Sequence, residues 1–66
     1  MNIREKLEAA AKAETQAIQA GSDEEILLYA QERNYYFDQV KLAIRSTGAE
    51  VTDGQIQKWA NHYKDK

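Results

Sequence analysis

Two apolar faces run along residues 22–47, and they limit the possible folds of this 66-residue chain more than any other feature. On a helix of 3.6 residues per turn, the broad face has apolar residues at intervals of three and four, namely Ile26, Tyr29, Ala30, Tyr36, Phe37, Val40, Ala43 and Ile44. Nearly opposite lies a narrow stripe formed by Leu28, Tyr35 and Leu42. A helix with two apolar faces needs cover on both sides. The narrow stripe therefore meets either another helix of this chain or another chain.

Helix start and stop signals divide the chain into three segments. A capping box, in which Asn, Ser or Thr is followed three residues later by Glu or Gln, occurs at Asn2 with Glu5, Ser22 with Glu25, and Thr52 with Gln55. Gly21 and Gly48 are predicted to end the first two helices at positive φ. We therefore expect one all-α domain over residues 1–66, with the first and third helices packed on a long central helix. The predicted helices cover approximately residues 3–20, 23–47 and 53–64.

The two outer helices each have one predicted apolar face. The face of the first helix is rich in alanine and comprises Ile3, Leu7, Ala10, Ala11, Ala17 and Ile18. The face of the third helix comprises Ile56, Trp59, Ala60 and Tyr63. Arg33 interrupts the broad face of the central helix, and its guanidinium needs water or an acidic partner. We predict that Glu14, near the apolar face of the first helix, is this partner.

Composition excludes several classes of function. The chain has 0 Cys, so disulfides and thiolate metal sites are excluded. The net charge is -2 and no segment is basic, which argues against nucleic acid and anionic membranes as partners. No apolar run approaches the roughly 20 residues of a membrane span, and we expect no signal peptide. We expect a cytoplasmic protein with no membrane partner.

The sequence contains little that is typical of catalysis. The sequence has a single histidine, His62, which lies on the predicted polar face of the last helix without a Cys or Ser beside it. The three glycines are isolated at helix boundaries, so they form no phosphate-binding loop. The acidic run Asp23–Glu25 is explained by its place in the first turn of a helix. We therefore expect no enzyme activity, no cofactor and no metal.

DNA binding is the alternative hypothesis. The second and third predicted helices resemble a helix-turn-helix, whose last helix would present four side chains able to read base edges: Gln55, Lys58, Asn61 and His62. Affinity for DNA depends largely on Lys and Arg at phosphates. Because this face contains a single Lys, we place DNA binding second.

The main functional prediction is a small non-catalytic regulatory module that binds another protein and associates with itself. It depends on the stripe of Leu28, Tyr35 and Leu42, because Tyr side chains are favoured at interfaces. The sequence leaves open whether this stripe is an interface, as in a homodimer through the central helix, or is covered within the chain. Small regulators encoded by phages and mobile elements often have this build, and such an origin is a further hypothesis.

Overall fold

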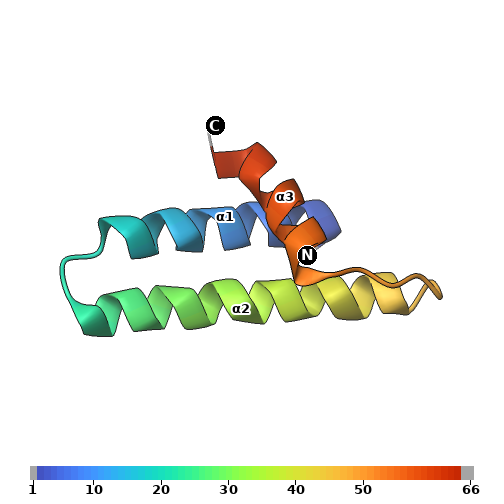
Figure 1. The fold of residues 1–66 in the computed structure, drawn as a ribbon, viewed down its shortest axis with the longest axis horizontal. Coiled ribbons are helices and arrows are strands. Elements are labelled where there is room, and N and C mark those ends of the chain that lie inside the picture. Colours follow the sequence, from blue (N-terminus) through green and yellow to red (C-terminus); the bar gives the residue numbers. More distant parts are fainter. Residues whose placement is uncertain (1, 65–66) are drawn as a thin grey trace.

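A computed structural model describes residues 2–64 and confirms the all-α, three-helix fold. The helices are α1 (Ile3–Gln19), α2 (Asp23–Arg45) and α3 (Asp53–Lys64) (Figure 1). The long central helix is therefore α2, which ends slightly before the predicted boundary. The chain from Ser46 turns and returns to the start of α3.

The helices are arranged as a hairpin with a crossing helix. α1 and α2 lie side by side and antiparallel, and α3 crosses α1 over the half nearer its N-terminus (Figure 1). The third helix contacts the central helix as expected, but it contacts α1 far more than α2. The alanine-rich face of α1 explains this result. Ala10, Ala11 and Ala13 are almost completely buried, and their small side chains let both neighbouring helices approach α1.

The helix starts follow the predicted capping chemistry. Asn2 and Glu5 form the complete capping box: Asn2 Oδ1 accepts from the Glu5 N–H at 2.8 Å, and Glu5 Oε1 accepts from the Asn2 N–H at 3.3 Å. At α2, Ser22 Oγ accepts from the Glu25 N–H at 3.3 Å. At α3, Thr52 Oγ1 accepts from the Gln55 N–H at 3.2 Å. The hydroxyls of Ser22 and Thr52 thus cap their helices, but the return contacts from the Glu25 and Gln55 side chains that would complete the predicted capping boxes are not formed at these two described helix starts.

The two predicted glycine stops differ. Gly48 has φ of 89° and occupies the left-handed region expected after α2. For Gly21 the prediction is wrong, because Gly48 is the one residue with positive φ in the described chain. Instead, α1 ends at Gln19, and its C-cap residue Ala20 has extended backbone angles of φ -65° and ψ 144°. The connection to α2 is extended and needs no left-handed residue.

The core lies where all three helices meet. Its buried residues are Leu7 and Ala10 of α1, Phe37 and Val40 of α2, and Ile56 and Ala60 of α3. Partly buried apolar side chains pack around it, including Tyr36, Ile44, Val51, Trp59 and Tyr63. Val51, just before α3, packs against the core that contains Ile56 of the first turn of α3, an arrangement typical of a hydrophobic staple.

The end of the hairpin near the α1–α2 connection extends beyond α3. Ile18 is 75% exposed and Ile26 is 42% exposed, so the prediction that both belong to core-facing lines is wrong. The reason is where α3 lies: it crosses α1 over the half nearer the N-terminus of α1 and then rises away from the hairpin, so no described helix packs on this end (Figure 1). We call Ile18, Ile26 and Leu27 the hairpin tip.

The packing predicts different costs for one substitution at two leucines. Leu7 is 6% exposed in the core, whereas Leu27 is 60% exposed at the hairpin tip. We expect Leu7→Ala to lower the free energy of unfolding by roughly 2–5 kcal/mol through lost contacts and a cavity. We expect Leu27→Ala to change it by no more than about 0.5 kcal/mol. Urea unfolding followed by circular dichroism measures both values, and equal costs would contradict this core.

Candidate functional site

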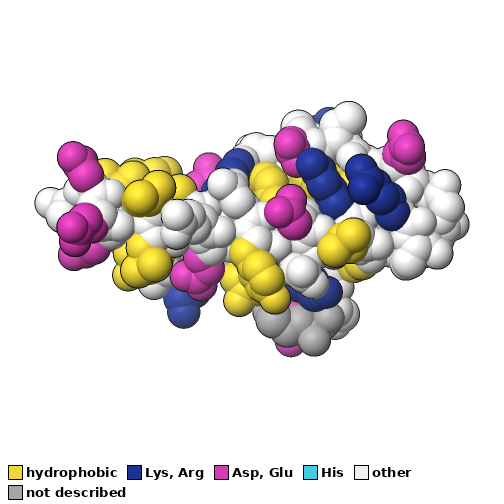
Figure 2. Space-filling model, turned by 90° about the horizontal axis from the view of Figure 1, so that it is seen from below, with side chains coloured by type: hydrophobic (Ala, Val, Ile, Leu, Met, Phe, Trp, Pro, Cys, Tyr) yellow, Lys and Arg dark blue, Asp and Glu magenta, His cyan; other side chains and the backbone are white. Residues whose placement is uncertain are grey.

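The predicted stripe on α2 lies on the molecular surface. Leu28 is 61% exposed, and Tyr35 and Leu42 are each 58% exposed. No described helix covers these side chains, so the alternative of a stripe buried within residues 2–64 is not observed. Figure 2, which views the molecule from the α2 side, shows hydrophobic side chains spread along this surface. We call Leu28, Tyr35 and Leu42 the outer stripe, and its role as an interface stays a prediction.

The central residue of the outer stripe is connected to the core through its neighbour. The Tyr35 and Tyr36 rings are in edge-to-face contact, with centroids 5.3 Å apart and an interplanar angle of 74°. Tyr36 is half-buried and packs against the core. Tyr35 is therefore restrained on one side by a fixed ring, while more than half of its surface faces solvent. A restrained aromatic side chain loses little conformational entropy when a partner binds.

Charges are distributed unevenly along α2. Its first turn carries three acidic residues, Asp23–Glu25, and its last turn carries Arg45. Lys41, one turn earlier, pairs with Asp53 at the start of α3, with Nζ 2.6 Å from Oδ1. In Figure 2, acidic side chains lie at the end where α2 begins, and Lys and Arg side chains gather toward the opposite end. The first turn of α2 is thus acidic, whereas its C-terminal part carries Arg45 and the paired Lys41.

The hairpin tip is an apolar surface that sequence periodicity does not identify. Leu27, 60% exposed, lies between the two predicted faces of the helix, and Ile18 and Ile26 were predicted to face the core. The sequence held no signal for this exposure, because it depends on where α3 crosses α1. The tip and the outer stripe meet at the adjacent residues Leu27 and Leu28.

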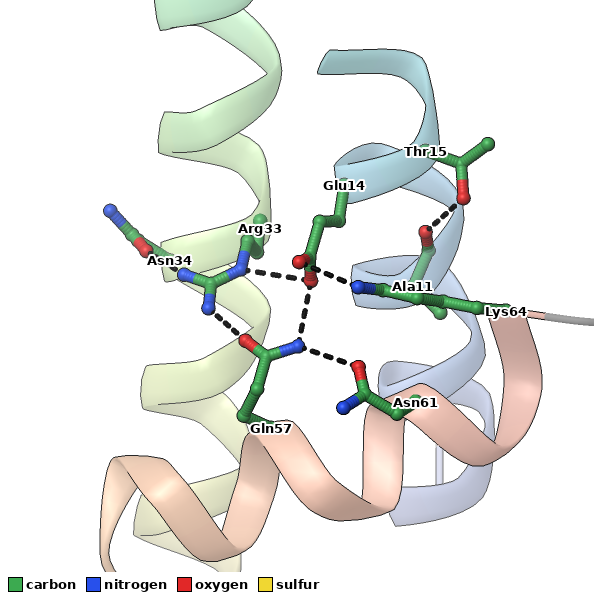
Figure 3. Close-up of polar contacts among 8 residues, drawn as sticks. All are labelled: Ala11, Glu14, Thr15, Arg33, Asn34, Gln57, Asn61 and Lys64. Atoms are coloured by element: carbon green, nitrogen blue, oxygen red, sulfur yellow. Dashed lines mark hydrogen bonds and ion pairs between the residues drawn. The ribbon is translucent and has the colours of Figure 1, made fainter. Parts of the chain in front are cut away.

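A second functional candidate is a polar cluster centred on Glu14, which joins all three helices (Figure 3). Glu14 Oε2 accepts from Arg33 Nε at 3.2 Å and from Gln57 Nε2 at 2.9 Å. Glu14 Oε1 accepts from Lys64 Nζ at 2.7 Å. The predicted Arg33–Glu14 pair is therefore confirmed, while Gln57 and Lys64 of α3 are partners that the sequence did not predict. Asn61 extends the cluster, accepting from Gln57 Nε2 at 2.9 Å.

Arg33 is held by several groups at once. Besides Glu14, its guanidinium donates to Gln57 Oε1 and to Asn34 Oδ1. Its Cζ atom lies 4.1 Å from the centroid of the Phe37 ring, which gives a cation–π contact at the edge of the core. The Arg33 side chain is 27% exposed. An arginine in an apolar face is thus accommodated by an aromatic ring beneath it and polar partners around it.

The environment of Glu14 favours its ionised form. Burial alone would raise the pKa of Glu14, but the hydrogen bonds from Lys64, Gln57 and Arg33 outweigh it and lower the pKa below the ordinary value of 4.5. Both carboxylate oxygens are occupied by these donors. Such a carboxylate is poorly placed to accept a proton from a substrate. The cluster is best understood as a link between helices.

The four residues of the DNA-binding alternative are all exposed on α3. Among them, Asn61 already accepts a hydrogen bond from Gln57, and Lys58 contributes the only fixed positive charge. The connection from α2 to α3 has seven residues, 46–52, compared with about 3–4 in a helix-turn-helix. The packing of α3 on α1 also differs from the expected pairing of α3 with α2. The four side chains are thus accessible to DNA, but Lys58 remains the one fixed positive charge among them.

The described surface has two hollows apart from the outer stripe. One hollow lies between α1 and α3 and is lined in part by Lys12, Gln16 and Tyr63. Another lies beside Arg33 and Asp53. His62 lines neither of them. Across residues 2–64, no group of three or more His, Cys, Asp or Glu side chains is arranged to hold a metal ion.

None of the three described helices combines the length and the apolar character that a membrane crossing requires. Comparisons with protein-family models, with curated proteins and with solved structures found no match to this chain.

The polar cluster predicts a specific effect of removing its central charge. We expect Glu14→Gln to lower the free energy of unfolding by about 1–2 kcal/mol at pH 7, because Arg33 and Lys64 lose their shared anion. The matched control is Glu8→Gln. Glu8 belongs to an exposed pair with Arg4 on the same helix, so we expect a change within about 0.5 kcal/mol. Equal effects of the two substitutions in urea unfolding would contradict a structural role of the cluster.

The lowered pKa of Glu14 predicts that the loss of stability caused by Glu14→Gln depends on pH. A carboxyl group whose pKa is lower in the folded state stabilises the fold above its unfolded pKa, here about 4.5. This contribution to stability decreases as the pH falls below the unfolded-state pKa and through the lower folded-state pKa. The difference in unfolding free energy between the original protein and Glu14→Gln should therefore be constant near neutral pH and shrink in acid. A difference that grows in acid would contradict the lowered pKa of Glu14.

Proposed function

We propose that this protein is a small non-catalytic interaction module that acts by binding another protein and that also associates with itself. The observation that carries the proposal is the exposure of the outer stripe along the middle of α2. Three large apolar side chains, each more than half exposed, follow one another on successive double turns of a helix. An ordered apolar stripe that the described chain does not cover is typical of a helix that packs on a partner helix.

The second part of the proposal is that two surfaces have two uses. Self-association would use the outer stripe, since it lies on a straight, regular helix that can align with a copy of itself. The hairpin tip, with Ile18, Ile26 and Leu27, would then be available to a different protein. Because the tip projects past α3, a partner can approach it without displacing a helix of the core.

The polar groups support a binding role over a catalytic one. Glu14, the carboxylate with a shifted pKa, has both oxygens occupied by donors from other helices. His62 is exposed on α3 and lines neither of the hollows described above. A cytoplasmic location belongs to the same proposal, and it is supported by a sequence with 0 Cys.

Adjacent leucines provide a matched test of the proposal. Leu28 and Leu27 are 61% and 60% exposed, but only Leu28 belongs to the outer stripe. We expect Leu28→Glu to abolish self-association at concentrations where the original protein associates, because it places a charge in the apolar stripe. Tyr35→Glu should have the same effect. Leu27→Glu should leave self-association unchanged, and sedimentation equilibrium over a wide concentration range measures all four proteins.

Circular dichroism should show equal helix content in these variants, so that a loss of association is not a loss of folding. If the original protein remains monomeric at all concentrations, self-association is wrong. If Leu27→Glu and Leu28→Glu weaken association equally, the outer stripe is not the contact surface.

A further inference from the structure

We infer that two copies of this chain pair through antiparallel α2 helices, with a two-fold axis passing beside Tyr35. This inference rests on the proposed self-association and adds its geometry. It follows from the register of the outer stripe and from the charge polarity of the same helix face. Both features belong to exposed side chains of a single helix, so they are available to a second copy without any change in the fold.

The outer stripe is symmetric about its central residue. Leu28 precedes Tyr35 by seven positions, and Leu42 follows it by seven. In an antiparallel pair centred on Tyr35, each Leu28 therefore lies at the level of Leu42 of the second copy, and the two Tyr35 rings meet at the axis. A two-fold contact of this kind uses the same patch on both copies and closes after two. The stripe thus suits a dimer in which each of its three apolar side chains has a counterpart on the second copy.

The charges distinguish the antiparallel pair from a parallel one. Glu24 and Arg45 are exposed near opposite ends of the stripe, and neither forms an ion pair with another described residue. In the antiparallel pair, Glu24 of each copy lies beside Arg45 of the other, which gives two opposite-charge contacts. A parallel pair would instead bring the two acidic first turns, Asp23–Glu25, together. Opposite charges across an interface fix the orientation of the partners.

The residues between these pairs are compatible with the antiparallel arrangement. On one side of the stripe, Gln31 faces Asp38 of the second copy, and on the other side, Glu32 faces Gln39. Each contact joins an acidic residue to a neutral amide, so like charges do not face each other along either side. Asp38, Gln31 and Glu32 are exposed, and Gln39 is half-buried. The amides can donate hydrogen bonds to the carboxylates.

The available area predicts a weak dimer. A half-exposed Leu or Tyr offers on the order of 100 Å² of surface, so three from each copy supply about 600 Å² in total. Stable interfaces bury more than about 1,000 Å². The charged and amide side chains must add the remainder, and the association should therefore weaken as salt is increased. This dependence on the flanking charges makes the orientation testable.

Distance measurement between spin labels tests the orientation directly. Because the chain has 0 Cys, Thr47→Cys creates a single labelling site just past the end of α2. In the antiparallel dimer the two labels lie about 36 Å apart along the helix axes, since each is 12 residues from the two-fold axis. In a parallel dimer they lie at the same level, separated mainly by the 8–10 Å between packed helices. Asn34→Cys, close to the axis, should give a short distance in the antiparallel dimer and serves as the control.

Charge exchange provides a second, independent test. We expect Glu24→Arg and Arg45→Glu each to raise the dimer dissociation constant roughly 3–10-fold, because each places like charges together twice per dimer. The double variant restores opposite charges and should return the dissociation constant to within about 3-fold of the original. Circular dichroism checks that all three variants keep their helix content.

The outcomes separate this inference from the proposed function. If the two spin labels at Thr47→Cys lie close together in the dimer, the antiparallel geometry is wrong but self-association stands. The same conclusion follows if the double charge exchange fails to restore the dissociation constant. An original protein that sediments as a monomer at all concentrations overturns both. A long distance together with charge rescue supports the two-fold pairing beside Tyr35.

Discussion

The close approach permitted by the small residues of α1 is the constraint on which the rest of the structure depends. Ala10, Ala11 and Ala13 are at most 2% exposed, so α2 and α3 both rest against this helix. α1 is therefore the shared neighbour of the other two, although α2 is longer. This position also explains the polar cluster. Glu14, one position after Ala13, lies where the two neighbouring helices converge, and it accepts from Arg33 of α2 and Lys64 of α3.

The same packing accounts for the exposed apolar surface. A short α3 that lies on α1 leaves the outer face of α2 without a neighbour and the hairpin tip without a third helix. In Figure 1, α3 crosses α1 and then rises away from the hairpin, so it covers neither the tip nor the outer face of α2. The two apolar surfaces thus have different structural causes: the tip lies away from the place where α3 crosses α1, and the stripe lies on the face of α2 that is turned away from α1. This difference supports assigning them to different partners.

Local features of the sequence predicted most of the secondary structure. Capping at Asn2, Ser22 and Thr52 was predictable because these contacts join residues three positions apart. The Arg33–Glu14 pair was predicted because a cation in an apolar face needs water or an acidic partner and Glu14 lies near the apolar face of the first helix. The roles of Gln57 and Lys64 were not, because they depend on where α3 crosses α1. The exposure of Ile18 and Ile26 was missed for the same reason, since periodicity defines a face but not what covers it.

Small size makes folding and association parts of one energetic problem. A domain of 66 residues buries a limited core, and in this chain disulfides are absent as a means of reinforcement. The cluster around Glu14 supplies part of the missing reinforcement by linking three helices through one carboxylate. Burial of the outer stripe against a second copy would supply another part, since a partner that binds only the folded state stabilises it by mass action. Exposure of the outer stripe to water is unfavourable in the monomer. In the proposed dimer the same stripe is buried, and it then contributes both specificity and stability.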